Sequence, residues 1–276
     1  MTTISPSSLP PERFDANQVA LSGAITRIWA RGSDVFARLD TGNSNETGDD
    51  LSELVNRATL LFPGGRLSGQ ELSLLKGDCL RLAGYLVDLT QSENLQDFLR
   101  KAEKLELLDE LRSYEIPETA LAAHARRATT CVISENLEHL SAAVALNSVC
   151  LEGVIAKVWD FDRHRFARLA VYDRNTATTG QEGKNGRPRR IPHYVTIQFP
   201  DGQVSGRPVS LKAKDRIRAS GYLVDRPYSE DLRNFLLDAH QAEILSKIPN
   251  SDDVADLRIR RSSACVVVQT MIQFTR

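Results

Sequence analysis

Residues 147–159 read Asn-Ser-Val-Cys-Leu-Glu-Gly-Val-Ile-Ala-Lys-Val-Trp, and residues 17–29 read Asn-Gln-Val-Ala-Leu-Ser-Gly-Ala-Ile-Thr-Arg-Ile-Trp. Both segments carry Asn, Val, Leu, Gly, Ile and Trp at the same places, with an offset of 130 residues from 17 to 147. The likeness continues at that offset through Phe36-Ala-Arg-Leu39 and Phe166-Ala-Arg-Leu169. A repeat of this length predicts two units of similar fold within one chain.

The composition is that of a soluble globular protein. The 276 residues suffice for two domains, and the 41% hydrophobic and 26% charged fractions are ordinary for that class. We find no apolar run of membrane-spanning length and no secretory signal pattern, so we expect a cytoplasmic protein. The scattered cysteines lack the spacing of metal ligands, and neither a metal nor a cofactor is expected. They are Cys79, Cys131, Cys150 and Cys265.

Each copy shows the pattern of five short strands. Residues 17–29 alternate apolar and small or polar side chains, which predicts a strand with one buried face. A glycine within this strand indicates a bulge or a sharp coil. The other predicted strands of the first copy are 35–40, 58–62, 77–88 and 126–133, and those of the second are near 166–169, 194–199, 214–225 and 260–267.

A helix is expected between the fourth and fifth strands of each copy. Ser92 and Ser229 are candidate N-caps. One apolar stripe follows at helical spacing in each copy, as Leu95, Phe98, Leu99 and Ala102 and as Leu232, Phe235, Leu236 and Ala239. We expect this helix to plug a barrel or cover a sheet.

These elements predict a mostly β fold with added helices, built as two tandem five-stranded Greek-key barrels of the OB-fold type. The expected boundaries are a disordered N-terminus at 1–14, a first barrel at 15–134, a connector with a helical turn at 135–146 and a second barrel at 147–276.

The chain resembles the bacterial single-stranded-DNA-binding protein family. The likeness is carried by the first-strand pattern Asn-x-Val-x-Leu-x-Gly-x-Ile, by Tyr194-Val-Thr-Ile-Gln-Phe199, and by a Gly-Asp or Lys-Asp pair entering a strand that ends Gly-Tyr-Leu. It covers most of residues 15–276. The resemblance implies single-stranded DNA as the partner, bound by base stacking within a basic groove, a role in DNA replication or repair, and a homodimer that brings four barrels together. It implies no small-molecule substrate.

The family's stacking positions transfer mainly to the second copy. They fall on Tyr172, on His193 beside Tyr194, and on Tyr228. The first copy has Gly42-Asn43, Asn56 and Gln91 at these places and therefore lacks the stacking residues.

Local charge also separates the copies, although the formal net charge of the whole chain is only −1. The loop between strands two and three carries a net charge of −4 over residues 40–57 and +3 over residues 173–190. Because binding of single-stranded DNA depends on neutralising its phosphates, the loop of the second copy should attract the DNA and the loop of the first copy should repel it. The candidate nucleic-acid-binding residues are Trp159, Arg163, Arg165, Arg168, Tyr172, Arg174, Lys184, Arg187, Arg189, Arg190, His193, Tyr194, Arg226, Tyr228, Arg260 and Arg261.

Several alternatives stay open. Trp29 and Trp159 occur in both copies and also suit a barrel core or rim, and the pairs Arg126-Arg127 and Arg260-Arg261 suit structural ion pairs as well as a groove. A protein–protein adaptor with degenerate barrels and a single-stranded RNA binder are the competing functions. An enzyme is not expected, since the chain has no phosphate-binding glycine loop and no recognisable catalytic motif.

Overall fold

The computed structural model describes residues 15–42, 56–67, 69–114, 116–142, 144–175, 178–182, 188–247 and 257–274. The N-terminal segment expected to be disordered, 1–14, lies outside these ranges, as does most of the acidic loop of the first copy. The described chain is mostly β, with one ten-stranded hydrogen-bonded sheet and short helices.

Five strands of the first half pair in a closed ring. The order of pairing is β1 (Asn17–Arg31), β2 (Asp34–Asp40), β3 (Arg57–Phe62), β7 (His124–Leu140), β6 (Cys79–Asn94) and back to β1. Only β3 and β7 run parallel. A 3-10 turn, η1 (Pro63–Gly65), and the small hairpin of β4 (Arg66–Leu67) and β5 (Gln70–Glu71) connect β3 to β6.

The second half repeats this ring. The order is β8 (Leu146–Phe161), β9 (His164–Val171), β12 (His193–Phe199), β16 (Arg258–Phe274), β15 (Arg216–Asp231) and back to β8. Between them lie the hairpin of β10 (Thr178–Glu182) and β11 (Pro188–Arg190), the 3-10 turn η2 (Pro200–Gly202), and the hairpin of β13 (Gln203–Val204) and β14 (Arg207–Pro208).

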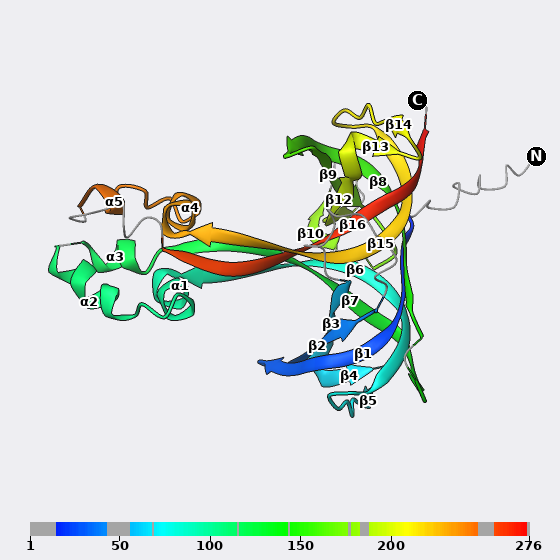
Figure 1. The fold of residues 1–276 in the computed structure, drawn as a ribbon, viewed down its shortest axis with the longest axis horizontal. Coiled ribbons are helices and arrows are strands. Elements are labelled where there is room, and N and C mark those ends of the chain that lie inside the picture. The colour runs from blue at the N-terminus through cyan, green and yellow to red at the C-terminus, as the bar shows by residue number, and fades with distance from the viewer. Residues whose placement is uncertain are drawn as a thin grey trace, which may run out of the picture.

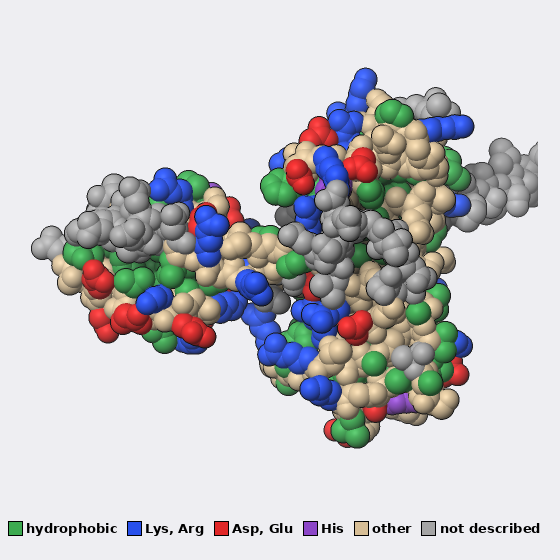
Figure 2. Space-filling view, viewed as in Figure 1, with side chains coloured by type: hydrophobic (Ala, Val, Ile, Leu, Met, Phe, Trp, Pro, Cys, Tyr) green, Lys and Arg blue, Asp and Glu red, His purple; other side chains and the backbone are tan. Residues whose placement is uncertain are grey.

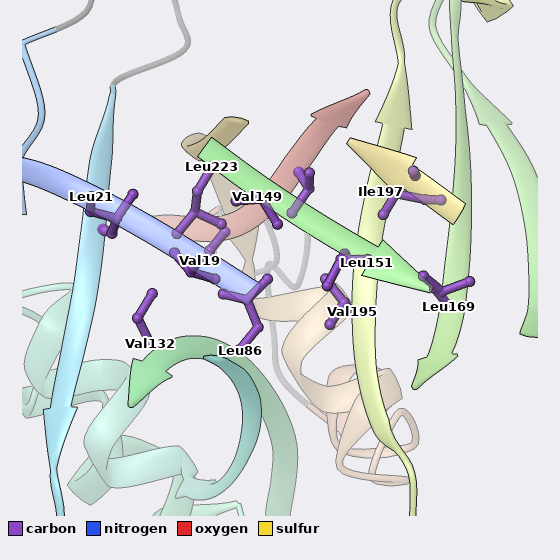
Figure 3. Close-up of a cluster of buried hydrophobic side chains, with 14 of the residues drawn as sticks. Val19, Leu21, Leu86, Val132, Val149, Leu151, Leu169, Val195, Ile197 and Leu223 are labelled. Carbon is purple, nitrogen blue, oxygen red and sulfur yellow. The ribbon is translucent and has the colours of Figure 1, made fainter. Parts of the chain in front are cut away.

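The two rings join through antiparallel pairing of β1 with β8. The register places Asn17 opposite Leu151, Val19 opposite Val149 and Leu21 opposite Asn147. Because counterparts are 130 residues apart, this register relates the halves by a local two-fold axis at Val19 and Val149, as in an isologous dimer interface. The apolar interiors of the two rings meet there in one continuous core (Figure 3).

The asparagine that opens each copy has a structural role. The Asn17 side chain donates to the Leu86 carbonyl and accepts from the Leu86 amide, both at 2.9 Å. Asn147 makes the same pair of bonds to Leu223, at 2.7 and 2.8 Å. Each asparagine thus binds β6 or β15 of its own half beyond the point where backbone pairing ends.

A close backbone approach explains the glycines of the fourth strands. Gly84 and Gly221 lie at the register shifts of β6 against β7 and of β15 against β16. A Cβ on either would stand 1.9 Å from the carbonyl oxygen of Ile133 or Val267. These glycines thus mark bulges in the fourth strands, whereas in β1, where the sequence predicted a bulge or coil at the glycine, the register shift lies between Ile25 and Arg27, beyond Gly23.

The fourth and fifth strands extend beyond the rings as two long hairpins. These run together away from both rings to form an arm, with helices at its tip (Figure 1). The helices are α1 (Leu95–Lys101), α2 (Glu106–Ser113) and α3 (Glu118–Leu121) from the first half and α4 (Leu232–Asp238) and α5 (Ile244–Lys247) from the second.

The helices do not plug the rings, which was one of the two placements expected for them, and lie at the tip of the arm instead. The stripes of the two halves pack on each other, with Phe98 and Phe235 at 4.8 Å between ring centroids, in a second core separate from that of the rings. An apolar stripe predicts burial but not the surface that buries it.

The expected N-caps and connector also need correction. β6 and β15 continue past Ser92 and Ser229, and the caps are Asn94 and Asp231, whose side chains accept from the amides of Asp97 and Asn234 at 2.8 and 2.7 Å. Residues 135–140, expected in a connector with a helical turn, belong to β7, because their backbone completes the ladder with the start of β6.

Candidate nucleic-acid interface

The outer face of β8, β9 and β12 carries the most concentrated set of predicted residues. Cross-strand pairing aligns Lys157, Arg168 and Thr196 in one row, and Trp159 lies beside Phe166 in the next. A register shift between Ile155 and Lys157 places the Lys157 and Trp159 side chains of β8 on the same face as Arg168 and Thr196. The row and Trp159 line an open pocket of about 430 Å³.

Trp159 is held with one ring face against the molecule. It stacks on the buried Phe166 at 5.7 Å with an interplanar angle of 13°. The Lys157 ammonium lies 5.9 Å from its ring centroid, within cation–π range. A partly exposed indole held flat in this way offers a platform for another planar group.

The three tyrosines assigned to stacking are all exposed. Tyr194 lies on the same face as the pocket, with the Arg168 guanidinium carbon 5.8 Å from its ring centroid. Tyr172 follows β9, and its amide donates to Asp15 at 2.9 Å. Tyr228 lies on the arm portion of β15, paired in register with Arg261. Tyr194 therefore belongs with the pocket, whereas Tyr228 lies out along the arm.

His193 does not present itself as a stacking residue. It is half-buried between Tyr85 of the first half, 6.3 Å away between centroids, and Asp173, 3.8 Å from its Nε2. Asp173 in turn accepts from Asn17 at 2.5 Å. This histidine joins the two halves at the edge of the face.

Most arginines around the pocket are ion-paired. Arg163 lies 3.3 Å from Asp201, Arg165 2.8 Å from Asp160, and Arg174 2.8 Å from Glu135 of the first half. The hydrogen bond from Arg165 to Asp160 raises the pKa of Arg165. Arg163 and Arg174 are exposed, so their ion pairs should be weak, whereas Arg165 is half-buried and holds Asp160 with two nitrogens.

Arg226 has a different environment from these surface arginines. Its guanidinium carbon lies 5.4 Å from the centroids of both Phe161 and Phe166. It is half-buried, so it supports the aromatic cluster beneath Trp159 from the side of β15.

The basic loop is described only in part. Lys184 and Arg187 lie outside the described residues, and so does the side chain of Arg189. The backbone of β10 and β11 forms a hairpin that leads to the half-buried Arg190.

The arginine pair at the start of β16 divides between its two readings. Arg260 is exposed, but Arg261 is half-buried in an ion-pair cluster with the buried Glu93 of the first half, at 2.5 Å, and with the buried Glu230. Lys101 also reaches Glu93, at 2.5 Å. The assignment of Arg261 to a groove is therefore corrected to a structural one, since its donors are occupied in joining the two hairpins of the arm.

The first half keeps the central row of the pocket, which the sequence prediction missed. Arg27, Arg38 and Thr59 align across β1, β2 and β3 as Lys157, Arg168 and Thr196 do in the second half. Trp29 stacks on Phe36 at 5.5 Å and 10°, with the Arg27 guanidinium 5.4 Å away. A cation two residues before the tryptophan in both copies was the available signal.

Each half also contributes a carboxylate to the other half's row. Arg168 pairs with Asp88 of β6 in the first half and donates to Thr196 at 2.8 Å. Reciprocally, Arg38 pairs with Asp225 of β15 in the second half. These crossed pairs follow the same two-fold axis as the β1–β8 register. Lys and Arg side chains gather where the arm leaves the two rings (Figure 2).

Over the described residues, no group of three or more His, Cys, Asp or Glu side chains is placed to hold a metal ion. Across the same ranges, none of the helices combines the length and apolarity that a bilayer crossing demands. Cys131 and Cys265 are buried, which raises the pKa of each thiol to about 12, while Cys79 and Cys150 are half-buried.

No protein-family model matches this chain, and no curated protein sequence matches it significantly. Among solved structures, it is similar to the wild-type single-stranded DNA binding protein from Thermus aquaticus, with 15% identity and a TM-score of 0.46, over 96% of this chain and 95% of that one. A deletion variant of the same Thermus aquaticus protein gives 13% identity and a TM-score of 0.47, over 95% and 96%. At this identity the likeness does not identify functional residues.

Proposed function

We propose that this chain binds single-stranded DNA with little sequence preference, chiefly through its second half, and that each ring of strands is an OB-fold barrel. The observation that carries the proposal is the pocket beside Trp159. A partly exposed indole, an exposed tyrosine and two cations share one face of three strands there. This combination suits a nucleic acid whose bases are unpaired, because only those bases expose both ring faces for stacking.

In this mechanism, bases stack on Trp159 and Tyr194, and the path extends towards Tyr172 and Tyr228. Phosphates contact Lys157 and the cations of the loop, Lys184, Arg187 and Arg189. Each stacked base contributes about 1–3 kcal/mol, whichever base it is, which gives affinity without sequence preference.

The opposite loop charges support the second half as the main binding half. A net charge of +3 over 173–190 favours phosphate, whereas −4 over 40–57 opposes it. The first half then acts as a scaffold or a weaker extension of the path. We further propose that two chains associate so that four barrels cooperate, which light scattering of the purified protein would test.

Titration of tryptophan fluorescence with oligo-dT over a series of salt concentrations tests the proposed activity. We expect quenching, because Trp159 stacks with a base, and an affinity that falls as salt rises. Duplex DNA of equal length should bind far more weakly, and an RNA oligomer of the same sequence as a DNA probe decides between the two nucleic acids. Absence of binding, or binding indifferent to salt, would refute the proposal.

A charge reversal separates strand binding from an adaptor role. Arg187→Glu should weaken binding to oligo-dT, while Arg100→Glu, the same change on α1 at the far end of the arm, should not. If the chain is instead an adaptor that binds only proteins, the wild-type protein should have no affinity for oligo-dT, and neither substitution should change that result.

A further inference from the structure

Arg168 is constrained by both halves of the molecule. One nitrogen of its guanidinium donates to Thr196 at 2.8 Å within its own half, and another pairs with Asp88 of the first half. The side chains of Arg168 and Asp88 are only 26% and 13% exposed. Two directions of the guanidinium fork are thus occupied, and its carbon lies 5.8 Å from the centroid of Tyr194.

Asp88 is fixed as firmly as its partner. It accepts from the Thr130 hydroxyl at 3.0 Å, across the β6–β7 ladder. Burial raises the pKa of Asp88, and the Arg168 charge and the Thr130 hydrogen bond oppose that rise. Because the Asp88 carboxylate has little access to water, removing either partner of the Asp88–Arg168 pair would leave the other charge uncompensated.

The same arrangement recurs at the first half's face. Arg38 and Asp225 are 26% and 11% exposed, close to the values for Arg168 and Asp88. A contact present once could result from local packing, but a reciprocal pair follows from how the two halves dock. In both rows, the acid that pairs with the arginine comes from the opposite half.

We propose that Asp88 and Asp225 are positioning residues that act across the interface between the halves, each holding the opposite arginine in place as a neutralised planar group on the strand-binding face. This inference rests on the function proposed above. Arg168 then presents its guanidinium plane to a base, in the way that arginine stacks on aromatic rings. It does not count among the cations that release counterions from phosphates. The phosphate-neutralising cation of the row is Lys157, which is exposed.

The salt dependence of binding distinguishes these two roles. For single strands, the slope of log Kobs against log salt changes by about 0.7 for each phosphate neutralised. Lys157→Gln should therefore flatten the slope by about 0.7, whereas Arg168→Gln should lower affinity and leave the slope almost unchanged. Asp88→Asn frees the Arg168 charge and should steepen the slope by about 0.7.

The double variant Asp88→Asn with Arg168→Gln should return the slope to the wild-type value, because neither charge remains. In the Asp88→Asn variants the amide oxygen can still accept from Thr130, and thermal melting checks that each variant is folded. If Asp88→Asn does not fold, the comparison of Arg168→Gln with Lys157→Gln decides alone. Equal flattening by these two variants, or an Asp88→Asn slope like that of the wild type, would overturn the inference. A wild-type protein that binds no strand would instead refute the proposed function.

Discussion

The two halves share their architecture but differ on the face that is proposed to bind single-stranded DNA. Both keep the β-ring, the opening asparagine, the tryptophan on a phenylalanine and the central row of a cation, an arginine and a threonine. They differ where the second half has Tyr194 and Phe161 and the first has Arg57 and Arg31. What is shared holds the fold and the interface together. What differs, including the charge of the loop, is what the proposed function would use to make the second half the stronger binder.

The largest effect should come from a residue that the halves share. Gly84→Ala and Gly221→Ala would each bring a Cβ to 1.9 Å from a carbonyl oxygen of the paired strand. We expect each to lower the free energy of unfolding by about 4 kcal/mol, because backbone on both sides must shift. Denaturant unfolding measures this, and a loss confined to one of the two glycines would show that the halves are less alike than their registers indicate.

The next effect tests how the halves are joined at the arm. Arg261→Gln leaves the buried carboxylates of Glu93 and Glu230 without their shared cation, at an expected cost of about 3 kcal/mol. The matched control is Arg260→Gln on the same strand, where exposure predicts a change within about 0.5 kcal/mol. Similar losses in the two variants would contradict the structural role given to Arg261.

A smaller effect tests the difference between the faces. Tyr194→Ala should weaken binding of oligo-dT by about 1–2 kcal/mol through the loss of one stacked base. Tyr114→Ala, at the tip of the arm, is the control for loss of a tyrosine as such. Arg57→Tyr places an aromatic side chain at the matching position of the first half. If the lack of this aromatic side chain is what limits DNA binding by the first half, the titration should show a longer binding site for the variant.

The smallest effect expected is a pH dependence of stability. Burial alone would raise the pKa of Glu93, but hydrogen bonds from Arg261 and Lys101 hold it below its ordinary value of 4.5. Its contribution to folding is therefore complete above that value and is lost as the pH falls through the lower pKa of the folded protein. Melting temperatures from about pH 7 down to about pH 3 measure this loss of stability, and Glu93→Gln should make the fall in melting temperature smaller. If the fall is the same in the variant, other carboxylates cause it.

The repeat allowed the strands and their buried faces to be predicted, because a strand's alternation is a local property. The arm was not predictable in the same way. Leu95, Phe98 and Leu232 indicated an apolar stripe, but its partner was the equivalent stripe of the other half, which no local pattern reveals.

The site divides in a similar manner. Trp159, Arg168 and Tyr194 were identified from residue type and position, and the structure brings them to one face. Arg261 was misassigned because its partner Glu93 is 168 residues away in sequence. The central row of the first half was not predicted, because that half lacks the aromatic residues that marked the second, although its cations and threonine match those of the second.

The pairing of Val19 with Val149 has a consequence for how the molecule behaves at low concentration. An interface of this symmetry ordinarily joins separate subunits, which dissociate on dilution by mass action. Here the polypeptide itself tethers the partners, so the contact survives at any concentration and the two halves always meet in a fixed ratio of one to one. An acidic loop can therefore accompany a basic one in every molecule. A dimer of two identical subunits could not have this asymmetry, because both subunits would carry the same loop.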